Sequence, residues 1–281
     1  MPQAHQIPPE VTRAARAAGK GIFPLGGPLE GSRWIEDGRL RLSPPEGAPR
    51  GVYLHLHGGG WTFGSPEHYD AANQALARAT GLAVLSARYR LAPEHPWPAG
   101  ADDACEALDF ILTHPEFGAG PVFIGGESAG AHYAAVALAR LAARGEAGRI
   151  AGAVLWYGLY DLRLTPSMAN WGPESLILST PTVEWFADNL TGGNRAARAD
   201  PALSPLLGDL AAFPPALLIC GTADPLIDDT LFLAARLAAA GRAVSARLYP
   251  GGVHAFDQFD LAIARAARAE AHAWILERMA A

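Results

Sequence analysis

The stretch that decides the fold is VFIGGESAGAHYAAVALARLAA, residues 122–143. Its first four residues predict a strand and its alanine-rich end predicts a helix, so Ser128 stands where a strand runs into a helix. A sharp turn there projects the serine clear of the sheet and strains its backbone. Gly126 and Gly130 suit the close passage of strand and helix, where a Cβ would collide. Gly-x-Ser-x-Gly at such a junction is typical of a serine nucleophile, and a serine N-cap is the alternative.

Strands and helices alternate on both sides of this junction. The expected strands are 52–57, 82–89, 122–125, 151–157, 216–220 and 243–249, and the expected helices are 11–18, 67–80, 101–113, 129–143, 183–190, 226–240 and 260–279. Residues 34–42 read as a hairpin with a two-residue turn at Asp37-Gly38. The strands lack polar alternation and are expected to be buried on both faces. We therefore predict an α/β fold with a mostly parallel, twisted sheet and helices on both faces.

A small helical cap is expected over the carboxyl ends of these strands. Residues 162–200 interrupt the alternation with several prolines and tryptophans and one short helix. An insertion of this length in an α/β unit is usually functional. We assign it, together with about residues 1–30, to a cap, and treat residues 1–281 as a single domain.

The glycine-rich stretch His57-Gly58-Gly59-Gly60-Trp61 ends the strand at 52–57. An attack on a carbonyl group creates an oxyanion, and backbone N–H groups can stabilise it. We assign the donors to Gly59, Gly60 and Ala129. A phosphate-binding loop is the alternative, but Phe63 stands where G-x-G-x-x-G needs its third glycine. The residues expected to support these motifs are His57, Gly58, Gly126 and Gly130.

His55 and His57 form a further alternative, because alternate residues of a strand share a face and two imidazoles could bind a metal. A metal site needs a third ligand and ordered support, and none is apparent nearby in the sequence. We therefore predict no metal and expect His57 to anchor the glycine loop.

The base and the acid follow from chain order, which in such proteins runs serine, then acid, then histidine. His254 comes a few residues after the last expected strand, whereas His272 falls inside the final helix and His132 inside the helix after Ser128, where packing is its expected role. Asp224 follows the penultimate strand in CGTADP, residues 220–225. These positions predict His254 as base and Asp224 as the acid that orients it.

Three other aspartates compete for the role of the acid. Asp228 and Asp229 fall in the first turn of the following helix, where a negative charge stabilises the helix dipole, and this is their expected role. Asp161 lies at a strand end, but one strand too early.

Taken together, the motifs resemble the hormone-sensitive-lipase-like family of esterases. The resemblance rests on HGGGW at 57–61, GESAG at 126–130, Asp224-Pro225-Leu226, His254, and YRLAPE at 89–94 followed by Trp97-Pro98-Ala99. It covers roughly residues 50–281 and departs from the family in a short N-terminal cap region. It implies an α/β-hydrolase fold and hydrolysis of short- to medium-chain carboxylic esters through an acyl-enzyme, without a cofactor. It also suggests a homodimer formed through the last strand and helix.

Two other functions remain open at this point. An amidase of the arylformamidase type would use the same three residues with a different leaving group. A non-catalytic small-molecule-binding protein could share the fold, but all three triad positions are filled here. The aromatic residues expected to line the substrate pocket are Trp61, Phe63, Trp171, Trp185 and Phe186.

Composition excludes several other classes of protein. The net charge is −6 and no basic cluster stands out, so we expect no nucleic-acid partner. No run of about 18 apolar residues predicts a membrane span, and the N-terminus shows no basic region followed by an apolar one. The two cysteines form no CxxC pair. We expect a cytoplasmic protein that acts on a small-molecule ester.

Overall fold

The structure is a computed structural model that describes residues 2–20 and 27–280. At the centre of the described part lies an eight-stranded sheet in the order β1-β2-β4-β3-β5-β6-β7-β8. From β4 to β8 neighbouring strands are parallel, while β1 and β2 add an antiparallel edge. The strands are β1 (Arg33–Ile35), β2 (Leu40–Ser43), β3 (Val52–Leu56), β4 (Ala83–Ala87), β5 (Val122–Glu127), β6 (Ile150–Trp156), β7 (Ala216–Ala223) and β8 (Val244–Val253). The predicted mostly parallel sheet is confirmed.

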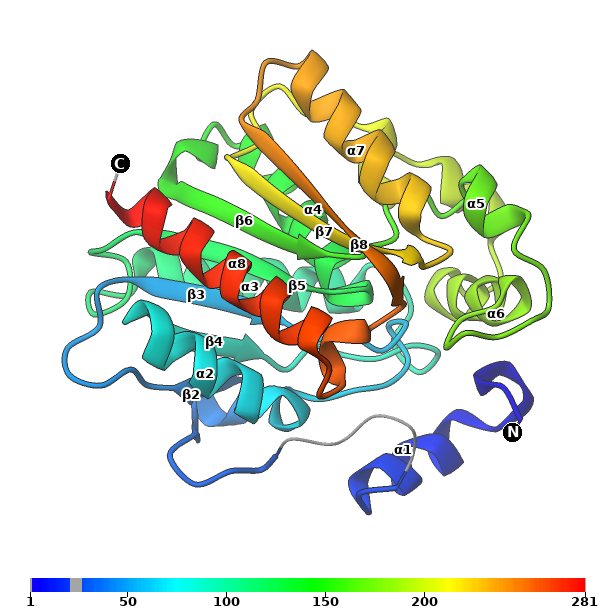
Figure 1. Cartoon of the computed structure of the whole chain (residues 1–281), viewed down its shortest axis with the longest axis horizontal. Helices are drawn as coiled ribbons and strands as arrows, with labels where there is room; N and C mark the ends of the chain where they lie inside the picture. Colours follow the sequence, from blue (N-terminus) through cyan, green and yellow to red (C-terminus); the bar gives the residue numbers. More distant parts are fainter. Residues whose placement is uncertain (1, 21–26, 281) are drawn as a thin grey trace.

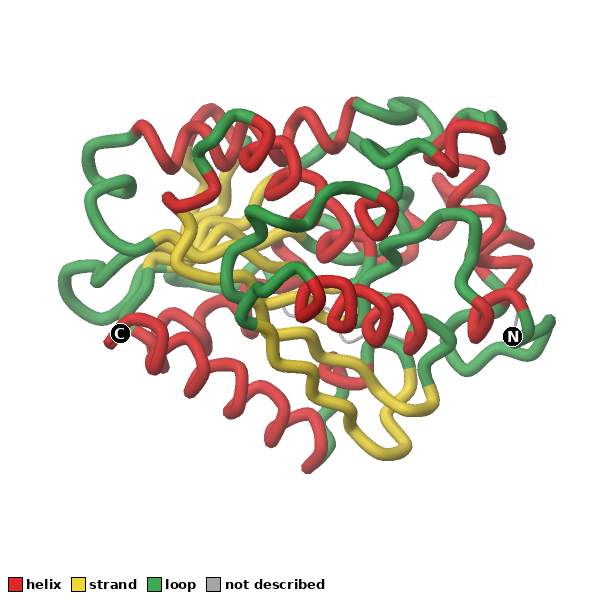
Figure 2. Tube along the Cα trace, turned by 90° about the horizontal axis from the view of Figure 1, so that it is seen from above, coloured by secondary structure: helices red, strands yellow, loops and turns green. Residues whose placement is uncertain are grey.

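Helices cover both faces of this sheet, as Figures 1 and 2 show. α3 (Ala99–Thr113), α4 (Ala129–Ala143) and α7 (Ile227–Ala239) bury apolar side chains against one face. α2 (Asp70–Thr80) and α8 (Ala262–Ala280) cover the other. The central strands are buried along almost their whole length because they are covered on both sides, which is why their sequences are apolar without alternation.

The hairpin at the edge of the sheet is present, but its predicted two-residue turn is wrong. β1 and β2 pair Ile35 with Leu40, so four residues connect the strands. They form a 3₁₀ turn at Glu36–Gly38, in which Glu36 and Asp37 both have φ of 50°. Two consecutive left-handed residues before Gly38 lengthen the loop beyond the turn that Asp-Gly alone would make.

A helical cover lies at the end of the sheet where the parallel strands terminate, on the right of Figure 1. It contains η1 (Ala4–Gln6), α1 (Pro9–Ala17), α5 (Pro166–Ala169) and α6 (Thr180–Thr191). α6 begins three residues before the predicted helix because the Ser179 side chain accepts a hydrogen bond from the backbone N–H of Thr182. Residues 1 and 21–26 of the expected cap lie outside the described residues, and its treatment as a cap stays a proposal.

Short 3₁₀ turns connect the remaining elements. They are η3 (Pro66–Tyr69), η4 (Ala147–Arg149), η5 (Arg195–Ala199), η6 (Pro205–Leu207) and η7 (Phe256–Gln258). η3 takes the first turn of the helix predicted from residue 67, so α2 starts only at Asp70. No helix in the described ranges is both long and apolar enough to cross a bilayer.

Candidate active site

Ser128 occupies the sharp turn between β5 and α4. Its φ of 54° and ψ of −116° place a non-glycine residue in a strained backbone region. A Cβ on Gly130 would lie 1.8 Å from the carbonyl oxygen of Leu56, and one on Gly126 would lie 2.1 Å from the same atom. The glycines are therefore required, as predicted, but the main obstacle is the end of the neighbouring strand β3. The close approach of strand and helix is a weaker obstacle, because a Cβ on Gly126 would lie 2.9 Å from the carbonyl carbon of Gly130.

The structure brings Ser128, His254 and Asp224 together. The Nε2 atom of His254 lies 3.0 Å from Ser128 Oγ, and its Nδ1 atom lies 2.8 Å from Asp224 Oδ2. β7 and β8 pair at Ala223 and Val253, so the acid and the base each follow the last paired residue of their strand. The Asp224 carboxylate is fully buried, and Oδ1 accepts the backbone N–H of Leu226 at 2.9 Å. These contacts fix the orientation of the imidazole.

The glycine loop runs beside this serine. Gly59 has φ of 132° and Gly60 has φ of 59°, and Gly59 O accepts the backbone N–H of Phe63. Within the described ranges, the N–H groups of Gly59 and Gly60 donate to no protein acceptor. A Cβ on Gly60 would lie 2.4 Å from the ring of Phe186 in α6. The loop thus offers two backbone donors and has no room for a side chain at residue 60.

His57 lies below the glycine loop. Its ring stacks on Tyr89 with centroids 4.0 Å apart, and the Tyr89 hydroxyl donates to His57 O at 2.6 Å. Its Nδ1 atom lies 3.0 Å from Gly58 O. Burial lowers the pKa of His57 to about 3, so the ring is neutral near pH 7. The contacts are those of a residue that holds the start of the loop.

His55 points to different partners from those of His57. Its Nδ1 atom lies 2.7 Å from Ser86 Oγ and its Nε2 atom 2.9 Å from Glu127 Oε2. Both ring nitrogens are therefore occupied by protein groups. Among the residues that the structure describes, no group of three His, Cys, Asp or Glu side chains is arranged to hold a metal ion.

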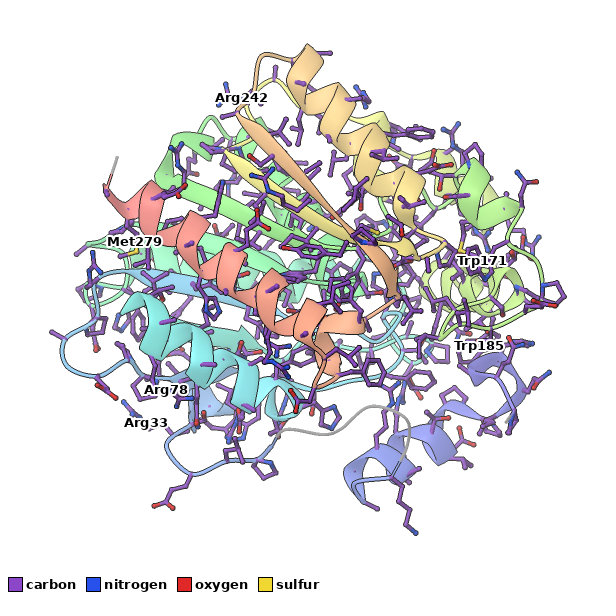
Figure 3. All side chains as sticks on the ribbon, viewed as in Figure 1. Arg33, Arg78, Trp171, Trp185, Arg242 and Met279 are labelled. Carbon is purple, nitrogen blue, oxygen red and sulfur yellow. The ribbon has the colours of Figure 1, made fainter. Side chains whose placement is uncertain are left out.

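A cavity of about 680 Å³ opens in front of Ser128 and His254. Of the five aromatic residues predicted to line it, Trp61, Phe63 and Phe186 do so. The prediction is wrong for Trp171 and Trp185, which lie in the outer part of the cover (Figure 3). Neighbouring residues on a helix point about 100° apart, so when Phe186 faces the cavity, Trp185 packs behind it, with ring centroids 5.1 Å apart. Trp171 instead donates its indole N–H to Glu174 O.

His132 supports the cavity wall from α4. It is fully buried, its Nδ1 atom accepts the indole N–H of Trp61 at 3.1 Å, and its Nε2 atom lies 2.7 Å from Leu203 O. Burial lowers its pKa to about 4. These contacts fit the packing role expected for it.

Tyr157 and Asp257 were not identified from the sequence. Tyr157 lines the cavity with φ of 35°, and its ring meets that of His254 edge-on, with centroids 4.8 Å apart. Its hydroxyl donates to Asp257. Burial, together with the charge of Glu127, raises the pKa of Asp257 to about 6. Asp257 follows His254 by three residues, and Glu127 directly precedes Ser128. Their nearness to these two residues in the chain was the one sequence feature that could have pointed to them.

Asp229 has a different role from the one predicted. It lies in the first turn of α7, as predicted, but it is fully buried and accepts the backbone N–H groups of Tyr160 and Asp161 and the hydroxyl of Thr165. Burial raises its pKa to about 7. The first turn of α7 packs against the loop after β6, and its carboxylates bind that loop, because Asp228 likewise accepts the backbone N–H of Ser167 at 2.7 Å.

Asp161, the third competitor for the role of the acid, is engaged elsewhere. Its carboxylate forms an ion pair with Arg163 at 2.7 Å. The hydrogen-bond partner of His254 is Asp224.

Comparison with known proteins agrees with this geometry. A family model described as alpha/beta hydrolase fold matches residues 53–258. The chain belongs to this family. It is 38% identical to carboxylic ester hydrolase LipN of Mycobacterium tuberculosis over 76% of this chain, and spans 59% of that relative's length. It is 34% identical to an ethyl acetate hydrolase of Pseudomonas putida, over 76% of this chain and 69% of the relative.

Solved structures of this family share the fold. An esterase of Pyrobaculum calidifontis superimposes with a TM-score of 0.88 at 28% identity, covering 100% of this chain and 96% of the other. A hormone-sensitive lipase from a metagenome library superimposes with a TM-score of 0.85 at 28% identity, over 97% and 92% of the two chains. The resemblance noted in the sequence is therefore confirmed.

Proposed function

We propose that this serine carboxylesterase hydrolyses short- to medium-chain carboxylic esters through an acyl-enzyme formed on Ser128. The observation that carries the proposal is the pair of hydrogen bonds that joins Asp224, His254 and Ser128 at the floor of a cavity. The name of the Pseudomonas relative, an ethyl acetate hydrolase, supports the short end of the acyl range.

Acylation uses these side chains and three backbone donors. His254 Nε2 takes the proton of Ser128 Oγ as the oxygen attacks the ester carbonyl. Asp224 holds the Nδ1–H of His254 and stabilises the imidazolium that forms. The resulting oxyanion accepts hydrogen bonds from the N–H groups of Gly59, Gly60 and Ala129, the last of which is the first residue of α4.

Collapse of the tetrahedral intermediate expels the alcohol, which takes its proton from His254. Water then attacks the acyl-enzyme as His254 removes one of its protons. When this second intermediate collapses, the bond from the acyl carbon to Ser128 Oγ breaks, Oγ takes the proton from His254, and the carboxylic acid leaves. Every proton in the cycle passes through one imidazole, so its position between Ser128 and Asp224 is essential. The homodimer and the cytoplasmic location inferred from the sequence stay predictions.

A series of 4-nitrophenyl esters from acetate to laurate tests the proposal. We expect kcat/KM to be highest for acyl chains of intermediate or short length and to fall for the longest. An organophosphorus serine probe should label the wild-type protein and leave Ser128→Ala unlabelled. Absence of both turnover and labelling would favour a non-catalytic binding protein, and faster turnover of anilides than of matched phenyl esters would favour an amidase.

A further inference from the structure

Tyr157 directly follows β6, the strand that lies between the strand of the nucleophile and the strand that leads to the acid. On one side, the carbonyl oxygen of Trp156 accepts the backbone N–H of Ser128 at 2.9 Å. On the other side, the backbone N–H of Tyr157 donates to Ile219 O of β7 at 2.6 Å. The backbone at this strand end is therefore fixed both to the turn at Ser128 and to the strand that precedes Asp224.

The side chain of Tyr157 packs against the base. Its φ of 35° is one that a bulky residue keeps only where the surrounding structure holds it. The residue is buried, and its ring meets the imidazole of His254 edge-on, at an interplanar angle of 65° and with centroids 4.8 Å apart. An unfavourable backbone conformation is thus maintained at the residue whose ring contacts the base.

The hydroxyl of Tyr157 binds the chain that follows the base. It donates to Asp257, three residues after His254. The carboxylate of Asp257 is buried, and its Oδ2 atom also accepts the side-chain N–H of Gln258 at 2.7 Å. The chain turns sharply at Ala255, whose φ is 58°, and this turn places Asp257 against the hydroxyl.

Different elements hold the chain on the two sides of the base. Before it, Val253 pairs with Ala223 of β7. After it, Arg268 of α8 donates to Asp257 O, and Tyr157 donates to the carboxylate of the same residue. Of these contacts, the one from Tyr157 is made by a side chain that also touches the imidazole, so it couples the position of the loop to that of the ring.

The reaction needs the imidazole at a defined angle. Asp224 binds Nδ1 of His254, but a single hydrogen bond tolerates a range of ring tilts. An aromatic edge packed against the ring restricts this tilt. Because Nε2 lies 3.0 Å from Ser128 Oγ, a small displacement of the ring weakens the hydrogen bond along which the proton moves, and misplacement by about 1 Å can cost roughly 100-fold in rate.

We propose that Tyr157 is a positioning residue for the base: its ring edge and its hydrogen bond to Asp257 together hold His254 at the angle at which Nε2 takes the proton of the nucleophile. The proposal rests on the esterase function above and adds a residue on which its chemical steps depend. The hydroxyl is engaged with a buried carboxylate, so it acts through the loop of the base and not on the substrate. Its loss should slow the chemical steps and leave substrate binding unchanged.

Removal of the Tyr157 hydroxyl is the first test. Tyr157→Phe keeps the ring and should lower kcat for 4-nitrophenyl acetate by roughly 10-fold, with KM changed by less than about twofold. Labelling of Ser128 by the organophosphorus probe, which uses the same base, should slow to a similar extent. Tyr160→Phe is the matched control and should alter neither rate, because Tyr160 is buried after the same strand and its hydroxyl has no hydrogen-bond partner among the described side chains.

Variants of Asp257 show whether the hydroxyl acts through that residue. Asp257→Asn keeps an oxygen that can accept from Tyr157 and should keep kcat within about threefold of wild type. Asp257→Leu has no acceptor and should reproduce the loss seen in Tyr157→Phe. The double variant Tyr157→Phe/Asp257→Leu should lose little more than either single variant, because both changes remove the same hydrogen bond. Thermal unfolding of each variant verifies that it is folded.

Each outcome bears on the proposal. It is overturned if Tyr157→Phe keeps the wild-type kcat and labelling rate, even with a lower Tm, since the hydroxyl would then serve stability alone. A KM that rises at constant kcat would place the hydroxyl on the substrate and overturn it as well, as would losses of kcat that multiply in the double variant. If the wild-type protein neither hydrolysed esters nor reacted with the probe, the esterase function itself would be contradicted.

Discussion

The described residues include two hydrogen-bonded arrays of a serine, a histidine and a carboxylate. The serine and the histidine of one array line the cavity, whereas the other array reaches it only through its carboxylate, Glu127. In the first, His254 lies between Ser128 and Asp224, with contacts of 3.0 Å and 2.8 Å. In the second, His55 lies between Ser86 and Glu127, with contacts of 2.7 Å and 2.9 Å. By residue type and hydrogen-bond length the two arrays are nearly the same.

Their surroundings differ. Ser86 lies within the central strand β4 and is 1% exposed, whereas Ser128 stands on a strained turn at the edge of a cavity. The glycine loop lines that same cavity. The comparison teaches that a Ser-His-acid set becomes a candidate for catalysis through the backbone around it: an elbow that exposes the hydroxyl and amides that can meet an oxyanion.

Removing each serine in turn gives the largest expected contrast. Ser128→Ala should lower kcat for a 4-nitrophenyl ester by roughly 10³-fold or more, because the nucleophile is lost. Ser86→Ala should keep kcat within a few-fold and cost about 1 to 3 kcal/mol of stability, because the buried Nδ1 atom of His55 loses its 2.7 Å contact and keeps only one of 3.4 Å with Asn73. Kinetics and thermal unfolding of both variants measure the contrast. If the two variants lost kcat to a similar extent, the claim that only the array of Ser128 is catalytic would be wrong.

Replacing the acid of the first array should give the next largest loss of kcat. Asp224→Asn should lower kcat by roughly 10³-fold, because an amide cannot hold His254 in the required tautomer or stabilise its charged form. Asp228→Asn, which alters a carboxylate that binds the backbone N–H of Ser167, is the matched control and should change kcat by less than about tenfold. The reverse order would move the acid to Asp228.

The smallest effect concerns Asp257, which lies between the two arrays, bonded to Tyr157 and close to Glu127. Its pKa in the folded protein is raised from 3.8 to about 6 by burial and by the charge of Glu127. Between these pH values the folded state holds more protons than the unfolded state, so the free energy of unfolding falls as pH rises. The stabilising contribution is complete below about pH 4 and lost above about pH 6.

Thermal unfolding across this range checks the sign. The difference in Tm between wild type and Asp257→Asn should decrease from pH 4 to pH 7. Asp260→Asn, at a side chain that is 91% exposed, should show no such trend. A difference that stays flat or increases would contradict the buried, protonated state of Asp257.

The sequence predicted the sheet and the set Ser128, Asp224 and His254 because both depend on local patterns joined by chain order. An apolar run followed by a helical run predicts a parallel unit, and in such a sheet successive strand ends meet at one edge. The glycines around Ser128 indicated a sharp turn there, and the chain order of serine, acid and histidine identified Asp224 and His254. Residues at the ends of strands, such as these three, could therefore be predicted without knowledge of any contact between distant parts of the chain.

Features that depend on distant contacts escaped the sequence. By its place in the sequence, Asp229 resembles an acid that stabilises a helix dipole, but its partners Tyr160, Asp161 and Thr165 are 64 to 69 residues away in the chain. Whether Trp185 or Phe186 faces the cavity depends on how α6 is rotated, and both are large aromatics. Local pattern identifies such residue types but does not supply the packing that selects between them.

The contact between residue 60 and the ring of Phe186 constrains how the pocket can be redesigned. A methyl group at residue 60 would overlap the ring by more than small adjustments can relieve, since the separation would be 2.4 Å. Substitutions at the two sites are consequently epistatic: trimming Phe186 is a precondition for a side chain at residue 60. Libraries that mutate one site at a time would discard both partners of a productive combination, so directed evolution of this pocket should randomise them jointly.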